Sequence, residues 1–223
     1  MKFMDTSLEL QANKYLSDIR LYRFKEMASN NDLLTLYMVN IELSMKTLGL
    51  IGLVEVILRN KVNKILSSDL GSDYLEGKHG FFTEKEKSTI GRLRKKIQNL
   101  SLNIKSSRLL SKLTFGFWCG LFQNNKLWCQ SLSKVFPKNM RQEQQITFRK
   151  INATLKKLYA LRNKIAHHER LLKKIDLQNN VFLPLRNLLD WLIDEEDKQF
   201  KTYILEHLEI NIKELEKLHV KTV

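Results

Sequence analysis

The chain has 223 residues, 43% of them hydrophobic, so it is long and apolar enough to bury a core, which argues against a disordered protein. It carries 38 Lys and Arg against 24 Asp and Glu, a net charge of +14. Such a field attracts polyanions, nucleic acid above all, although solubility alone also explains it.

A long helix is predicted first. No proline interrupts the chain from Asp32 to about Ser67, and apolar residues recur there at helical spacing. The pattern fits one helix or two in tandem bent near Gly49 and Gly52. A loop follows, in which the glycines are Gly71, Gly77 and Gly80.

The middle of the chain predicts shorter helices. Thr83 and Glu86 have the spacing of a capping box, which opens a basic helix from Glu84 to about Ile104. Ser106 and Ser107 are expected to break that segment. An aromatic cluster, LTFGFWCGLF, occupies residues 113–122, and another helical stretch covers residues 128–136 until Pro137 ends it.

The last third predicts one further core helix and two weaker ones. Neither Gly nor Pro occurs from Arg141 to Lys174, so a single helix of about thirty residues is allowed. Val181–Ile193 and Phe200–Leu218 are the two closing helices. Strand signals are nearly absent, so the predicted fold is an all-α bundle. We expect one domain over residues 1–223, with its core at about 32–193 and helical extensions at both ends.

Cysteine usage and hydropathy indicate the compartment. Cys119 and Cys129 stand among apolar and aromatic residues without a CxxC pair, which predicts reduced thiols in a protein core. The first ten residues lack the apolar core of a signal peptide. The most apolar stretch, residues 48–58, is too short to span a membrane and contains Glu55. We therefore expect a cytoplasmic protein without a membrane segment.

A polar centre interrupts the helix predicted from Arg141. Its apolar seam is Ile151, Leu155, Leu158, Ile165 and Leu172. Arg162 and Glu169 fall on this seam, with His168 nearer to it than to the opposite face. Buried charge is costly unless it is paired, so charges in such positions indicate an ion pair, an interface or a functional site.

The neighbouring stripe of that helix carries Asn163, His167 and Arg170. Asn163 is one turn before His167 and is placed to orient its imidazole by a hydrogen bond. Arg162 and His167 are about 140° apart around an ideal helix, so they do not share a narrow face. A second copy of the helix, in a dimer, would bring them to one ligand more easily.

These residues fit the cleavage of RNA by its own 2′-hydroxyl group. A histidine has the pKa range for exchanging the protons, and an arginine can stabilise charge on the phosphoryl oxygens. No metal or other cofactor is required, and the chain shows no zinc-ligand spacing. The alternative is that the adjacent histidines are structural or lie on an ordinary basic surface.

The segment RNKIAHHER, residues 162–170, resembles the signature of the Abi-like (abortive infection) proteins of the HEPN superfamily, in the form R-N-x-x-x-H. Four further landmarks extend the resemblance over most of the chain. These are YMVNIELS with LVEVILRN (residues 37–44 and 53–60), LTFGFW (residues 113–118), the aromatic residues Trp128 and Phe136, and LLDWLID (residues 188–194). Thr114 and Val39 depart from the family, which often has serine and tryptophan there.

The resemblance implies a HEPN-like helical bundle with long core helices that forms a homodimer and cleaves RNA in phage defence or as a toxin. Arg162 and His167 would be catalytic and Asn163 supporting. An antitoxin or another defence protein is a possible further partner. Position 169 is Glu, so the resemblance does not support silencing by a nucleotidyltransferase antitoxin, whose targets carry tyrosine there.

Other residues have two readings each. Glu55 and Arg59 form either a structural salt bridge in the bundle or part of the cleft, and His168 and Glu169 are possible supporting residues. The cluster at residues 115–118 either packs in the core, which its neighbours favour, or stacks RNA bases. A further set is predicted to contact RNA or simply to be solvated: Arg92, Arg94, Lys95, Lys96 and Arg170. For the whole chain, the alternative to an endoribonuclease is a non-catalytic HEPN module that binds RNA or protein.

Overall fold

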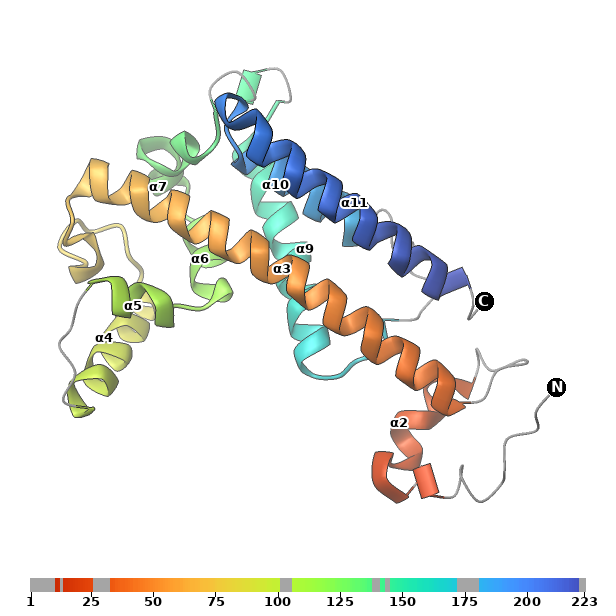
Figure 1. Cartoon of the computed structure of the whole chain (residues 1–223). Coiled ribbons are helices and arrows are strands. Elements are labelled where there is room, and N and C mark those ends of the chain that lie inside the picture. Colours follow the sequence, from red (N-terminus) through yellow and green to blue (C-terminus); the bar gives the residue numbers. More distant parts are fainter. Residues whose placement is uncertain are drawn as a thin grey trace.

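The structure, a computed structural model, describes residues 11–12, 14–25, 33–100, 106–137, 141–142, 145–171 and 181–220. All regular elements in these ranges are helices, which confirms the predicted all-α fold (Figure 1). The α-helices are α2 (Asp18–Tyr22), α3 (Leu33–Leu70), α4 (Glu84–Asn99), α5 (Ser106–Lys112), α6 (Phe115–Leu121), α7 (Asn125–Gln130), α9 (Phe148–Ala166), α10 (Leu183–Leu192) and α11 (Lys198–Val220).

Helix α3 is a single element of 38 residues, so the first of the two alternatives for this region is correct. No proline interrupts it, and its buried residues recur every three or four positions, from Leu36 through Val54 to Leu66. Gly49 and Gly52 lie within it without ending it. This helix crosses the whole bundle and supplies a surface on which α2, α6, α9, α10 and α11 pack (Figure 1).

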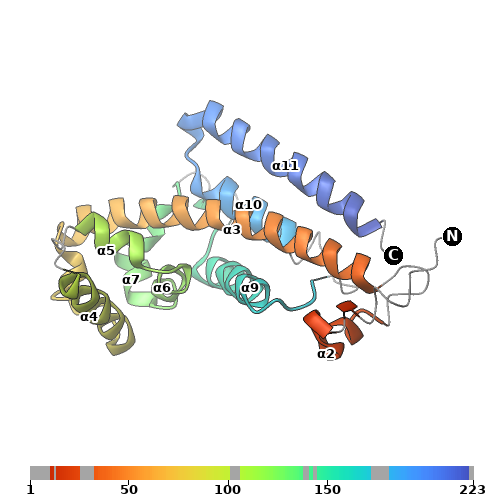
Figure 2. The ribbon, with the colours of Figure 1, turned by 60° about the horizontal axis from the view of Figure 1, so that its bottom comes forward.

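The remaining helices lie on different sides of α3. Helix α9 packs on one side, and α10 and α11 lie on the other (Figure 2). Helix α10 also contacts α9, and α6 contacts both α3 and α9. Helices α4 to α7 gather at the C-terminal half of α3, whereas α2 packs near its start. Arg162 therefore comes from a helix enclosed by α3, α6 and α10.

One lysine ties α10 to α3, and another ties α11 to α10. Lys61 of α3 donates to the Leu192 carbonyl at 2.7 Å and to the Asp194 carboxylate at 2.8 Å, which satisfies the C-terminal end of α10. Lys201, only 9% exposed, pairs with Asp190 at 2.9 Å and with Glu195. These contacts orient α10 and α11 relative to each other and to α3.

The segment between α3 and α5 matches its prediction closely but not completely. Gly71, Gly77 and Gly80 all have positive φ angles, which glycine adopts at low cost in tight turns. The capping box of Thr83 and Glu86 is present. Helix α4 ends earlier than predicted, at Asn99 with Leu100 as its C-cap, and residues 101–104 of the predicted helix lie outside the described residues. The two serines expected to break the segment instead begin α5.

The segment after α6 was predicted as one helical stretch and consists of two. Helix α7 ends at Gln130, and a 3-10 turn covers Leu132–Val135. Cys119 is buried, as expected, but Cys129 is exposed, so the prediction of a core thiol is wrong there. Both thiols are free. Helices α10 and α11 agree with their predicted positions within two residues. No helix in the described part of the chain has the length and hydropathy needed to cross a membrane.

Candidate functional site

Helix α9 ends inside the RNKIAHHER segment. His167 is its C-terminal cap, and His168 has a φ angle of 54°, in the left-handed region. The Glu169 N–H donates to the Lys164 carbonyl at 2.9 Å, and the His168 N–H donates to the Ile165 carbonyl at 3.0 Å. This pair of hydrogen bonds is a Schellman motif, with His168 in the position that glycine usually takes. The RNKIAHHER segment therefore contains the C-terminal end of α9.

The predicted helix of about thirty residues is therefore wrong at both ends. At the start, Gln145 has a φ of 48°, and Thr147 caps α9 by accepting from the Lys150 N–H at 3.2 Å. At the other end, the left-handed turn moves Glu169 and His168 off the apolar seam, and both are exposed. The lack of Gly and Pro allowed the prediction of a longer helix, but the cap at Thr147 and the left-handed turn at His168 set the length of α9.

The chain just after the turn is anchored to other helices. The Leu171 N–H donates to the buried Asn40 side chain of α3 at 2.7 Å, and Leu171 itself is buried. Arg170 donates to the backbone carbonyl of Arg23. The predicted RNA contact by Arg170 therefore competes with an intramolecular role. Leu172, the last predicted seam residue, lies outside the described residues.

Arg162 is half-buried and points among other polar groups. Its Nη1 donates to the Asn163 Oδ1 at 3.5 Å, a long contact. The predicted hydrogen bond from Asn163 to the imidazole of His167 does not form between these two described residues. Their backbones are joined instead, because the His167 N–H donates to the Asn163 carbonyl at 3.0 Å. Asn163 is thus a partner of the guanidinium group, and the exposed imidazole of His167 is left accessible.

Glu55 brings three helices together at Arg162. Its carboxylate, on α3, accepts the backbone N–H of Phe115 at the start of α6 and lies within electrostatic range of Arg162 on α9. Burial raises the pKa of Glu55, and Arg162, Arg59 and the Phe115 N–H oppose that rise without cancelling it. Neither predicted interpretation of Glu55 is complete, since its carboxylate interacts with the Phe115 N–H at the start of α6 as well as with the charge of Arg162.

Arg59 lies one turn beyond Glu55 on α3. It influences the Glu55 carboxylate electrostatically, but its Nε is buried without a hydrogen-bond partner in the described part of the chain. It also lines a hollow of about 410 Å³ together with Asn60, Asn63 and several serines. The predicted structural salt bridge with Glu55 is therefore a looser charge interaction.

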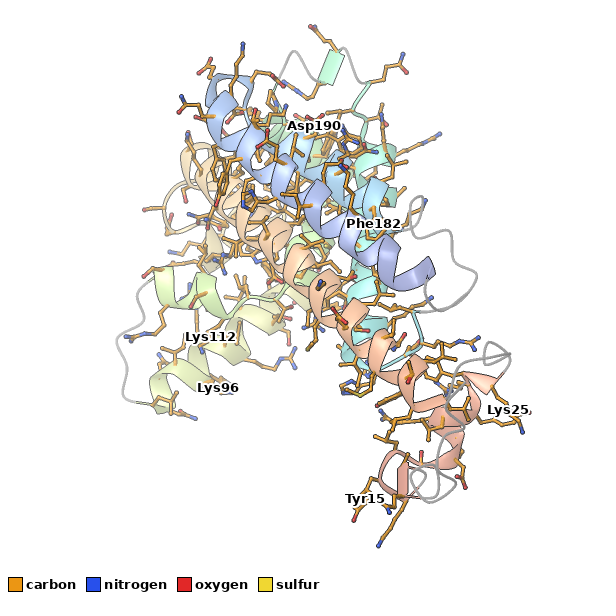
Figure 3. All side chains as sticks on the ribbon, turned by 45° about the vertical axis from the view of Figure 1, so that its right-hand side comes forward. Tyr15, Lys25, Lys96, Lys112, Phe182 and Asp190 are labelled. Carbon is orange, nitrogen blue, oxygen red and sulfur yellow. The ribbon has the colours of Figure 1, made fainter. Side chains whose placement is uncertain are left out.

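The four basic residues predicted on α4 differ in exposure. Arg92, Lys95 and Lys96 are exposed, whereas Arg94 is half-buried with an unpartnered, buried Nε and interacts electrostatically with Glu76. Figure 3 shows Lys96 near Lys112 of the neighbouring α5, at the end of the molecule away from Tyr15. Three of the four predicted residues therefore remain available to a polyanion.

The aromatic cluster belongs to the core. Phe115 and Trp118 are at most 1% exposed, and Phe117 packs edge-on against Trp118 with ring centroids 5.2 Å apart. Stacking of RNA bases on these rings would require unfolding, so the core reading is correct. Sequence reasoning missed the aromatic residue that is accessible nearby, Tyr159, which is 40% exposed. Its position four residues before Asn163, on the same stripe of α9, was the available signal.

The assembled site can perform charge stabilisation and proton exchange. It contains a half-buried guanidinium group, an accessible imidazole and a half-buried carboxylate. Among the described residues no cluster of His, Cys, Asp or Glu has the arrangement of a metal site. The site thus defines an all-helical protein with an Arg-Asn pair before a helix end and a histidine at its cap.

Comparison with known protein families shows to which family the chain belongs. A model of the Abi-like protein family matches residues 9–173, so the chain belongs to that family. The matched range runs from α2 through α9 and includes Arg162, Asn163 and His167, but it ends before α10 and α11. No curated protein and no solved structure shows significant similarity to the chain.

Proposed function

We propose that this Abi-like protein is a metal-independent endoribonuclease of the HEPN type that acts on cytoplasmic RNA in phage defence or as a toxin. One observation carries the proposal. At the end of α9, Arg162 is half-buried within electrostatic range of Glu55 and in long contact with Asn163, while His167, five residues later, is exposed. A positive charge and an accessible proton-exchanging group are what phosphodiester transfer requires.

In the proposed reaction the 2′-hydroxyl of one nucleotide attacks the adjacent phosphorus. The bond from the 2′-oxygen to phosphorus forms, the bond to the 5′-oxygen breaks, and the leaving oxygen takes up a proton. The imidazole of His167 accepts the hydroxyl proton or donates the proton to the leaving oxygen. The guanidinium group of Arg162 stabilises the charge on the phosphoryl oxygens. Asn163 positions that group, and His168 has a structural part in the turn.

We propose further that the active form is a homodimer with a composite site. Exposed hydrophobic side chains follow one side of α3, namely Met38, Met45, Leu48 and Val56. Gly49 and Gly52 lie between them, with no atom within 4 Å of the place a Cβ would occupy, so another helix can approach closely. This surface continues to Glu55 and Arg59 at helical spacing. A second copy packed there would place its own site beside the first.

Cleavage of total cellular RNA in EDTA tests the function. Wild type is compared with Arg162→Ala and His167→Ala, prepared in the same way so that a contaminating nuclease is detected. Cleavage by the wild type alone supports the proposal. Equal cleavage by both variants would refute the site, and RNA binding without cleavage would favour the non-catalytic alternative. The same substitutions should relieve any growth arrest on expression.

The dimer has its own test. Sedimentation equilibrium of the wild type should give twice the monomer mass, and Met45→Glu should give the monomer, because a carboxylate would have to be buried in the interface. Tyr22→Glu, an equally exposed residue on α2, is the control and should remain dimeric. A monomeric wild type with full cleavage activity would refute the composite site. An antitoxin or other defence partner would be found as a protein that suppresses cleavage.

A further inference from the structure

A second hollow lies beside the candidate site. It has a volume of about 540 Å³ and is bounded by the start of α4, by α6, by the start of α7 and by α9. Its walls are neither wholly apolar nor wholly charged. They combine an aromatic ring, bare glycine backbone, lysines and a carboxylate, and the residues that matter below are Glu86, Gly116, Gly120, Lys156 and Tyr159.

One wall is the ring of Tyr159 lying against α6. A Cβ atom on Gly116 would be 2.7 Å from Cε2 of Tyr159, so the ring rests directly on glycine backbone. No other residue type fits at this position without moving the ring. Tyr159 is nevertheless 40% exposed and lines the hollow. A ring that is held in place and still accessible is a platform for stacking a flat, unsaturated molecule.

Another wall presents a free hydrogen-bond acceptor. Glu86 uses its Oε2 in the capping box, accepting from the Thr83 N–H at 2.7 Å and from the Thr83 hydroxyl at 3.0 Å. Its Oε1 lies 3.7 Å from the place of a Cβ on Gly120 and has no hydrogen bond within the described part of the chain. Because a carboxylate oxygen accepts hydrogen bonds, this oxygen favours a base edge that presents an amino group to it over one that presents a carbonyl oxygen.

The hollow adjoins the groups assigned to cleavage. Tyr159 precedes Asn163 by one turn of α9, and Lys156 precedes Tyr159 by another, so a cation follows the ring. Cys119, in the wall, is close enough to Glu55 for that carboxylate to raise its thiol pKa, after the larger effect of burial. Arg162 follows Tyr159 by three residues on α9, so the two side chains are neighbours on the helix surface and a base stacked on Tyr159 would have its phosphate near Arg162.

We propose that this hollow is a nucleobase subsite that prefers bases with an exocyclic amino group over uracil. Tyr159 stacks on the base, Glu86 Oε1 accepts from the amino group, and Lys156 neutralises a neighbouring phosphate. Cytosine presents an N4 amino group where uracil presents a carbonyl oxygen, which a carboxylate repels. The inference rests on the proposed function, because it assumes that RNA is the substrate.

Binding of uncleavable RNA tests the subsite without depending on catalysis. The probes are short 2′-O-methyl oligonucleotides of cytidine and of uridine, and the measurement is fluorescence anisotropy at fixed salt. A charge-assisted hydrogen bond predicts that the cytidine probe binds about tenfold more tightly. Glu86→Gln should reduce this ratio to about one, since an amide both donates and accepts. Glutamine still completes a capping box, so α4 keeps its start.

The stacking wall is tested separately. Tyr159→Leu should weaken both probes about tenfold or more, whereas Tyr159→Phe should retain binding. Tyr203→Leu, at an exposed tyrosine of α11, is the matched control and should change neither. Equal binding of the two probes by the wild type, or an unchanged ratio in Glu86→Gln, would overturn the subsite. Discrimination without cleavage would support the subsite and refute the nuclease; cleavage with no discrimination would do the reverse.

Discussion

The two sides of the end of α9 differ in how firmly they are held. Before Ala166, Arg162 is half-buried and lies among Asn163, Glu55 and the start of α6. After it, His167 and His168 are exposed and are ordered mainly by backbone hydrogen bonds of the turn. The end of α9 therefore divides the RNKIAHHER segment into a half-buried charge, Arg162, and an exposed group that can carry protons, His167. Substitutions in these two halves should differ in their effects on stability and on activity.

The largest expected effects come from the two proposed catalytic residues. Arg162→Ala and His167→Ala should each lower the cleavage rate by about a hundredfold or more. Their stabilities should differ. Arg162→Ala leaves the half-buried Glu55 carboxylate without its strongest opposing charge and should cost about 1–2 kcal/mol. His167→Ala should stay within about 0.5 kcal/mol of wild type, because the side chain is exposed.

Urea denaturation of the same preparations gives the stabilities. A loss in His167→Ala as large as that in Arg162→Ala would show that both halves are structural, and the comparison would fail. Arg162→Lys keeps the charge but not the planar fork, so it should recover most of the stability and little of the activity.

The next effect concerns the anchor beyond the turn. Asn40→Leu removes the acceptor of the Leu171 N–H and leaves that group buried without a partner, which should cost about 2 kcal/mol. Hydrogen exchange should show faster opening of the backbone from His168 to Leu171, while the middle of α9 keeps its protection. Thr47→Leu, another buried polar position on α3, is the control and should not open this segment selectively.

A substitution at His168 should raise the free energy of unfolding, by less than the loss expected for Asn40→Leu. Its φ of 54° strains any residue with a Cβ, so His168→Gly should stabilise the protein by about 0.5–1 kcal/mol. His168→Ala removes the imidazole but keeps the strain and should not stabilise it. Cleavage should survive in both variants. Loss of cleavage in both would move His168 from the turn into the catalytic set.

The sequence predicted the helices better than their ends. Spacing of apolar residues and scarcity of proline placed α3, α9, α10 and α11, because burial of a helical stripe is a local pattern. The end of α9 escaped prediction because a histidine occupies the left-handed position that glycine normally marks. With the end misplaced, the periodicity assigned Glu169 and His168 to the wrong face.

For the candidate site, the sequence predicted a charge on the apolar seam but not the contacts of that charge. The pattern identified Arg162 as a charge on an apolar seam, and it is half-buried. Its partners come from α3 and α6, and helical spacing along α9 carries no information about other helices. The hydrogen bond from Asn163 to His167 was a local expectation that the turn prevents. Tyr159 was missed because its platform, Gly116, comes from a distant part of the chain.

The smallest predicted effect is a change with pH in the unfolding free energy, and it tests whether the Glu55 carboxylate near Arg162 destabilises the fold when it is ionised. Its pKa in the folded protein is raised above the ordinary value of 4.5, with burial the largest cause. The native state therefore holds this proton more tightly than the unfolded chain does. The contribution of Glu55 to stability is fully present below that ordinary value and is lost as the pH rises through the raised pKa.

Glu55→Gln measures this contribution, because glutamine can still accept the Phe115 N–H but does not ionise. Unfolding free energies of both proteins are compared at about pH 4 and about pH 7. The unfolding free energy of the wild type, relative to that of the variant, should be lower at about pH 7 than at about pH 4. Glu42→Gln, at another glutamate of α3, which pairs with Lys46, should show no such loss. If wild type instead gains stability, the attraction of Arg162 and Arg59 outweighs burial. The carboxylate would then stabilise the fold as well as orient the guanidinium group.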